Sequence, residues 1–273
     1  MVEWKSRLSL YIFRAKAWVS FWLKATNEHG IHSPFVYNLY TTLLFPKQGN
    51  LNLEHQNPNL ANDYRSIEQL RVAAKSNPTV VRGNDLGTGL PHAPRTIKHI
   101  ATNALKSPAQ ALLLARLVSF FQPQRILELG TSLGITTLYF AKSLPKSEVI
   151  TIEGNEEISK LALSHFETLK ANNIKQIQGN IDVELPKMKD SFDFVFFDGN
   201  HRKVPTLNYF EHCLKKANHK SVFVFDDIHW SPQMEEAWTT IQNHPAVTVT
   251  IDLFYLGIVF FHKGQSKENF SLK

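Results

Sequence analysis

The chain has 273 residues, of which 43% are hydrophobic, enough for one large α/β domain or for a domain with an appendage. Its single cysteine, Cys213, excludes an internal disulfide and a multi-cysteine zinc site, and is typical of a reducing compartment such as the cytoplasm. The formal net charge of +6 is compatible with an anionic partner such as nucleic acid or a membrane surface, but it is modest for this length.

The first 110 residues are predicted to form a mainly helical extension. Residues 4–25 combine aromatic and basic side chains, and Leu8, Tyr11, Ala15, Trp18 and Trp22 recur at helical spacing. We expect an amphipathic helix that packs on the domain, on a second subunit in a homodimer, or on a membrane surface as a peripheral contact. Charged residues within this run argue against a transmembrane span and against a signal peptide.

The remainder of this extension is harder to interpret. Pro34 predicts the start of a helix, residues 46–62 read as a loop, and residues 64–75 have helical periodicity. Residues 85–89 resemble a cofactor-binding loop, but Pro91 and Pro94 follow where a helix should continue. We therefore do not interpret residues 85–89 as the primary cofactor site. Residues 95–121 are expected to form one helix. The cofactor-binding domain is assigned to residues 111–273.

From residue 125 onward, strand-like and helix-like runs alternate. The predicted strands are 125–129, 148–153, 174–178, 192–198, 220–226, 246–253 and 255–262; the predicted helices are 134–144, 155–172, 203–217 and 231–243. Such alternation predicts a Rossmann-like, doubly wound α/β fold with a mostly parallel sheet of these seven strands. No helix separates the last two strands, so we expect an antiparallel hairpin at one edge.

Residues 125–137 read as a short buried strand, a glycine turn and the start of a helix. Glu128 lies near the carboxyl end of the strand, and Gly130 and Gly134 follow it. This geometry exposes backbone N–H groups at a positive helix N-terminus, where a cofactor can lie. The G-x-x-x-G spacing differs from that of dinucleotide sites, and the preceding acid suits a cofactor with an ammonium group. The pattern therefore indicates S-adenosylmethionine, with an ordinary strand-to-helix turn as the alternative.

Acidic residues also stand at the ends of three later predicted strands. Ligands of such folds bind beyond the carboxyl ends of the strands, and Glu153 is suitably spaced from the glycines to hydrogen-bond a ribose. Asp198, Asp226 and Asp227 would repel one another unless a divalent cation such as Mg²⁺ lay between them. Solvated strand-end acids are the alternative.

A cation at these aspartates would suit a particular chemistry. It would chelate a catechol or vicinal diol and lower the pKa of one hydroxyl group. His201, three residues after Asp198, is placed to take the proton. The residues thus predict methylation of an oxygen atom on a small hydroxylated acceptor.

Residues 125–262, about half of the chain, resemble the class I S-adenosylmethionine-dependent methyltransferases. Within that group they are similar to the metal-dependent O-methyltransferases of the catechol, caffeoyl-CoA and macrocin types. The resemblance implies that the cofactor is bound by Glu128, Gly130, Thr131, Ser132, Gly134, Thr136, Glu153, Asn180, Ile181, Asp182 and Asp198. It implies metal ligands at Asp198, Asp226 and Asp227. With His201 as the proton acceptor, the predicted catalytic residues are His201 and Asp198.

The sequence departs from the catechol-type pattern at two positions. That pattern has a lysine base where this chain has His201, and Asp-Asn where this chain has Asp226-Asp227; both features are closer to the macrocin type. Two other functions remain open: an RNA methyltransferase acting on ribose or on a base carbon through the basic N-terminal region, and a cofactor-binding module without catalysis. The residues do not identify the acceptor.

Overall fold

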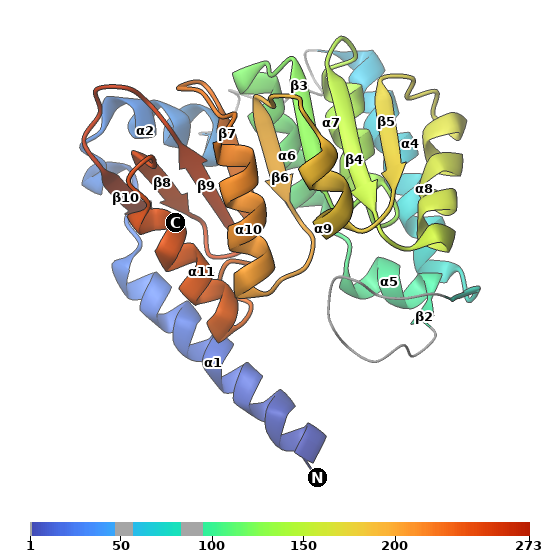
Figure 1. Ribbon diagram of the computed structural model, residues 1–273, viewed down its shortest axis with the longest axis horizontal. Coiled ribbons are helices and arrows are strands. Elements are labelled where there is room, and N and C mark those ends of the chain that lie inside the picture. Colours follow the sequence, from blue (N-terminus) through green and yellow to red (C-terminus); the bar gives the residue numbers. More distant parts are fainter. Residues whose placement is uncertain (1, 47–56, 83–94) are drawn as a thin grey trace. The chain divides into compact units, whose positions relative to one another are not determined.

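The computed structural model describes residues 2–46, 57–82 and 95–273 (Figure 1). The chain has the expected mixed α/β fold, with a mostly parallel sheet, flanking helices and a helical N-terminal region. It divides into two compact units, Met1–Ile31 with Asp190–Lys273, and His32–Lys189. The boundary expected near residue 110 divides the helical extension from the cofactor-binding domain by their predicted functions. The compact units are defined by contacts and do not test it, so it stays a prediction.

The first unit contains α1 (Val2–Lys24) and the C-terminal strands and helices. Its other elements are η1 (Glu28–Gly30), β6 (Phe194–Phe197), α10 (Lys203–Leu214), β7 (Val222–Asp226), α11 (Pro232–Asn243), β8 (Val249–Asp252), β9 (Leu256–Phe260) and β10 (Glu268–Ser271). The strands are ordered β10-β8-β9-β7-β6. The β8–β9 pair is antiparallel, as predicted, but it does not lie at the edge of the sheet. The edge strand is β10, which the sequence did not predict and which pairs with β8 in parallel.

Phenylalanine side chains fill the core of this unit. Phe194, Phe196, Phe223 and Phe225 are fully buried, and the rings of Phe197 and Phe225 stack at 4.2 Å between centroids. Strands buried on both faces need such continuous apolar runs, which explains why the sequence signal was strong. Cys213 is buried as well, and burial raises the pKa of its thiol to about 12, which is typical of a packed thiol rather than of a nucleophile.

The second unit contains the central helices and three parallel strands in the order β3-β4-β5. Its elements are α2 (Pro34–Leu39), η2 (Tyr40–Leu44), α4 (Pro58–Ser76), β1 (Val80–Val81), β2 (Arg95–Thr96), α5 (Ile97–Asn103), α6 (Pro108–Phe121), β3 (Arg125–Leu129), α7 (Ile135–Ser143), β4 (Glu148–Glu153), α8 (Glu156–Thr168), β5 (Ile174–Gln178), α9 (Ile181–Glu184) and η3 (Leu185–Lys187). In this unit α7 contacts α4, α6 and β4, while α8 contacts β4 and β5.

Two predictions about this unit were wrong in their boundaries. The helix expected over residues 95–121 is a short strand and two helices, because Ser107 forms a capping box with Gln110 and Pro108 starts α6. The loop expected to reach residue 62 ends earlier, because the Asn57 side chain caps α4 and Pro58 is its first residue. Residues 85–89, which resemble a cofactor-binding loop in sequence, lie outside the described residues.

No helix in the described parts of the chain is long and apolar enough to cross a membrane.

Candidate functional site

The strand–turn–helix motif predicted around Gly130 is present in the second unit. β3 ends at Leu129, α7 begins at Ile135, and the turn between them requires positive φ angles at Gly130 (105°), Ser132 (49°) and Gly134 (74°). Glycine adopts such angles without steric cost, which accounts for two of these three positions. Gly134 has a second reason, because a Cβ atom there would lie 2.5 Å from Cε1 of Phe166 in α8.

Backbone hydrogen bonds tie this turn to the end of β4. The N–H groups of Gly130 and Thr131 both donate to the carbonyl of Ile152, at 3.1 and 3.2 Å. The N–H group of Ser132 donates to Oε2 of Glu153 at 2.9 Å. The first two bonds join the turn to β4, and the third fixes the position of the Glu153 carboxylate.

Glu153 is the last residue of β4 and lies at the centre of this arrangement. Its Oε1 atom accepts a hydrogen bond from the Asn155 N–H at 2.9 Å, and its carbonyl accepts one from Gly179 at 2.9 Å. Asn180 then caps α9, its side chain accepting from the Asp182 N–H at 2.9 Å. The structure therefore brings together the glycine turn, the predicted ribose ligand and the residues at 180–182 that the resemblance assigned to the adenine.

Glu128 lies beneath the turn and is only 1% exposed. Its Oε2 atom accepts hydrogen bonds from the Thr137 hydroxyl and, at 2.7 Å, from the Thr151 hydroxyl. Burial raises the pKa of this carboxyl to about 7, although the two hydroxyl donors favour the charged form. A cationic ligand nearby would favour ionisation of this carboxyl at neutral pH.

The two threonines were missed by the sequence analysis. Thr137 is completely buried in α7, and Thr151 is completely buried in β4, where its hydroxyl also lies 2.6 Å from that of Thr131. Only the parallel register shows that Thr151 stands opposite Glu128. A polar side chain inside an otherwise apolar strand was the available signal, since buried hydroxyls require a partner.

An acidic cluster lies in the first unit. Asp198 directly follows β6, and Asp226 ends β7, which pairs with β6 in parallel so that Phe197 and Phe225 are register partners. Candidate ligand atoms of Asp198, His201 and Asp226 all lie within 4.8 Å of one another. His201 Nε2 is 3.7 Å from Asp198 Oδ1.

Asp227, the third aspartate expected at the metal, is not a member of this cluster among the described residues. It has a φ of 55°, and its N–H donates to the Tyr255 carbonyl at 2.9 Å. Its charge acts instead on Arg14 of α1, opposing the larger effect of burial, which lowers the pKa of that guanidinium group. The third member of the cluster is His201, for which the sequence predicted a different role.

The loop that carries His201 is shaped by Asn200, which the sequence analysis did not single out. Asn200 is 4% exposed and has a φ of 56°, a value that asparagine tolerates better than most residues. Its Nδ2 donates to the Tyr209 hydroxyl at 3.2 Å, and its Oδ1 accepts from Arg202 Nε at 2.7 Å. These bonds join the residue before His201 to the residue after it and to α10, so they fix the loop on both sides of His201.

The donor set of the cluster fits a divalent cation. Asp226 is 1% exposed, and a buried carboxylate close to a second one needs a positive partner to offset desolvation and repulsion. Two carboxylates and an imidazole are ligands for Mg²⁺, Mn²⁺ or Zn²⁺, and the oxygen donors favour the harder ions. Asp198 and Asp226 would hold the ion, with His201 beside them.

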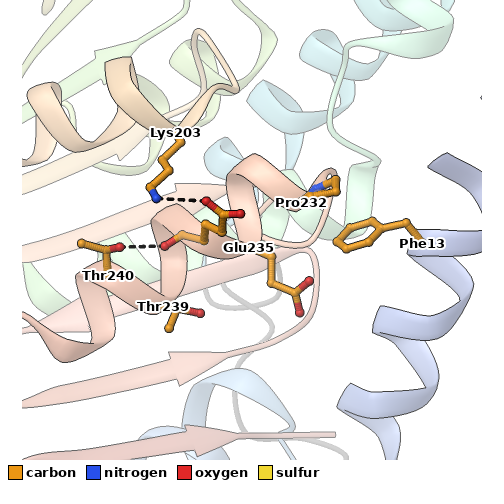
Figure 2. A pocket seen from close by; sticks show the side chains of 7 residues that line it. Phe13, Lys203, Pro232, Glu235, Thr239 and Thr240 are labelled. Carbon is orange, nitrogen blue, oxygen red and sulfur yellow. Dashed lines mark hydrogen bonds and ion pairs between the residues drawn. The ribbon is translucent and has the colours of Figure 1, made fainter. Parts of the chain in front are cut away.

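A separate surface pocket in the first unit contains none of these acids. It is lined by Phe13, Lys203, Pro232, Glu235, Glu236, Thr239 and Thr240. Figure 2 shows the Phe13 ring of α1 directed towards Pro232. Lys203 Nζ forms an ion pair with Glu236 Oε2 at 2.9 Å. We assign the pocket no part in the chemistry of the cluster.

Comparison with known proteins finds similarity to methyltransferases, as the glycine motif at residues 125–137 predicted. Residues 127–228 match the family model described as "Methyltransferase domain". The chain is 30% identical over 141 residues to the O-methyltransferase hkm8 of Aspergillus hancockii, covering 50% of this chain and 56% of that protein. It is 30% identical over 129 residues to the catechol O-methyltransferase of Niastella koreensis, covering 45% of this chain and 57% of that protein.

The match therefore spans little more than half the length of these curated relatives. Among solved structures, the methyltransferase PaMTH1 of Podospora anserina with bound SAH superposes with a TM-score of 0.59, at 14% identity, over 80% of this chain and all of that one. At such low identity the superposition demonstrates the shared fold.

Proposed function

From the premise that this chain carries a class I methyltransferase domain resembling those of catechol-type O-methyltransferases, we propose that it methylates an oxygen atom of a small hydroxylated acceptor. The methyl donor is S-adenosylmethionine, and a divalent cation assists. The observation that carries the assignment to oxygen is the convergence of Asp198, His201 and Asp226 within 4.8 Å at the ends of two neighbouring strands. A catechol or another vicinal diol is the acceptor class that such a cluster suits.

S-adenosylmethionine would supply a methyl group on a positively charged sulfur. In this proposal Glu153 binds the ribose hydroxyls with the lone pairs that Ser132 and Asn155 leave available on its carboxylate. The buried carboxylate of Glu128 places negative charge under the turn. Asn180, Ile181 and Asp182 border the adenine, and Thr131, Ser132 and Thr136 line the methionine end.

The cation would act as a Lewis acid that lowers the pKa of an acceptor hydroxyl. Asp198 and Asp226 would hold it, and His201 would take the hydroxyl proton at Nε2, the atom that lies 3.7 Å from Asp198 Oδ1. The deprotonated acceptor oxygen would then displace the methyl group from the sulfonium, forming the oxygen–carbon bond as the carbon–sulfur bond breaks and leaving a neutral thioether.

The test is calorimetric titration of S-adenosylmethionine and then Mg²⁺ into the wild type and Asp198→Ala. The proposal expects cofactor binding in both proteins and a metal signal that disappears in Asp198→Ala. Asp190→Ala, which removes an exposed acid of the same unit, is the matched control and should keep the signal. Absence of cofactor binding to the wild type would overturn the methyltransferase assignment.

An activity screen with catechols and diols completes the test. Methyl transfer that is lost with EDTA and survives nuclease treatment supports the proposal. Cofactor binding without a metal signal, together with strong, salt-dependent retention of RNA, would contradict the metal and the small acceptor while leaving the cofactor in place.

A further inference from the structure

Helix α1 has two apolar faces rather than one. The inner face consists of Leu10, Phe13, Ala17 and Phe21, at spacings of three and four residues, and all four are buried or half-buried. The Phe21 ring lies 5.5 Å from the Phe254 ring, between centroids, so this face packs within its own unit. The spacing predicted an amphipathic helix, but packing this inner face leaves a second apolar face outside.

The outer face of α1, as described from Leu8 onward, is a continuous apolar stripe. It consists of Leu8, Tyr11, Ile12, Trp18, Val19, Trp22 and Leu23, each between 47% and 72% exposed. The exposed Ala15 lies between Ile12 and Trp18, and with it the spacing of three and four residues keeps these side chains on one side of a helix over more than four turns. Single exposed apolar residues need no explanation, but a contiguous stripe of this length marks an interaction surface.

Helix α1 is held in place by contacts of two basic side chains, one on the helix and one at the end of the chain. Arg14 donates from Nε to the Trp230 carbonyl at 2.9 Å, and its guanidinium lies 3.3 Å from the centroid of the Trp230 ring. At the other end, Lys273 Nζ donates to the Trp22 carbonyl at 2.8 Å and lies 3.9 Å from the centroid of that ring. These contacts fix the orientation of α1 within its unit, with the outer face exposed.

The charge of α1 favours one kind of partner. The helix contains five basic residues (Lys5, Arg7, Arg14, Lys16 and Lys24) and one acid (Glu3), so it carries 5 − 1 = +4 of the chain's net charge of +6. Two copies joined along the outer face would bring together two helices of this net charge, and within α1 no acid follows Glu3. A bilayer containing anionic lipid offers the opposite charge and an apolar interior for the stripe.

We infer that α1 lies along the surface of an anionic membrane, with the outer face in the boundary between head groups and acyl chains. Trp18, Trp22 and Tyr11 suit this boundary because each combines an apolar ring with a polar group. Lys16 follows Ala15 at the edge of the stripe, where a long basic side chain can reach lipid phosphates while its methylene groups stay in apolar surroundings.

The experiment is co-sedimentation of the full-length protein with vesicles of phosphatidylcholine alone and of phosphatidylcholine with phosphatidylserine. We expect binding to the anionic vesicles that decreases with salt, and binding at least tenfold weaker to the neutral ones. Trp18→Gln combined with Val19→Gln should reduce the partition coefficient at least tenfold. Val72→Gln, at a residue 65% exposed on α4, is the matched control and should bind as the wild type does.

A charge variant separates the electrostatic contribution to vesicle binding from the apolar one. Lys16→Glu should weaken binding to the anionic vesicles and leave any weak binding to neutral vesicles unchanged, whereas Lys175→Glu on the exposed side of β5 should change neither. Equal binding of wild type and the Trp18–Val19 double variant would overturn the inference. So would a lipid-free dimer in sedimentation velocity that this double variant dissociates, since the outer face would then belong to a second copy. Salt-dependent RNA binding lost in Lys16→Glu, without vesicle binding, would also overturn it.

Discussion

The Glu128 carboxylate accepts a hydrogen bond from the Thr151 hydroxyl at 2.7 Å, across the register pair that joins β3 to β4. This bond places a buried, titratable carboxyl under the glycine turn. Because burial raises its pKa to about 7, its charge changes within the physiological pH range. Both the stability of the free protein and its affinity for a cationic cofactor should therefore depend on this residue.

Glu128 should make the cofactor-free protein less stable as the pH rises from 5 to 8. A carboxyl whose pKa is higher in the folded state binds more protons there, so its contribution is present at low pH and is lost as the pH passes 7. The full effect is about 3 kcal/mol in the free energy of unfolding. Urea unfolding at several pH values should reveal this slope, and Glu128→Gln should flatten it.

Binding of S-adenosylmethionine near pH 7 should release protons. A sulfonium or ammonium charge near Glu128 would lower the pKa of that carboxyl and drive off the proton it holds in the free protein. Calorimetry in buffers of different ionisation enthalpy measures the number released, and Glu128→Gln should reduce it. An unchanged release in this variant would show that the protons come from another group.

Gly134→Ala should destabilise the protein more than Gly264→Ala. Both glycines have similar positive φ angles, 74° and 76°, so the backbone strain of the two substitutions is matched. A Cβ atom at position 134 would lie 2.5 Å from Phe166, whereas nothing lies within 4 Å of one at position 264. We expect an additional loss of about 1–3 kcal/mol at Gly134 and weaker cofactor binding there, measured by denaturant unfolding and calorimetry. Equal losses would show that Phe166 moves aside without cost.

Glu68→Gln should destabilise the second unit, because Glu68 pairs with a buried arginine. Arg71 is 2% exposed, its Nε lies 2.8 Å from Glu68 Oε2, and the Tyr139 hydroxyl of α7 donates to Glu68 Oε1 at 3.0 Å. Removing one partner of a largely buried pair costs about 3 kcal/mol. Lys160→Gln, which breaks a solvent-exposed pair on α8, should cost far less, because water screens that pair. Similar losses for the two variants, by denaturant unfolding, would contradict this assignment.

His201→Gln should separate a proton acceptor from a metal ligand. If His201 acts as the base, the variant should keep its affinity for Mg²⁺ and lose roughly 10²- to 10⁴-fold in kcat. His219→Gln, at an exposed residue after α10, is the control and should keep both properties. Loss of metal affinity in His201→Gln, measured by calorimetry, would assign the imidazole to the coordination of the ion instead.

The sequence by itself determined the α/β fold from residue 125 onward, the glycine turn and the acids at the strand ends. These features are local: apolar runs of strand length, glycines at positive φ and carboxylates beside a turn can each be read within a few residues. The division of residues 95–121 was local too, but it depended on the capping box at Ser107, which the helical pattern concealed.

Only the tertiary structure decided which of these residues meet. The parallel register set Thr151 opposite Glu128, and the loop held by Asn200 brought His201, rather than Asp227, into the cluster with Asp198 and Asp226. Such contacts depend on strand pairing between distant segments, which side-chain periodicity does not encode. The same holds for α1, where packing of one apolar face decided which other face stayed exposed.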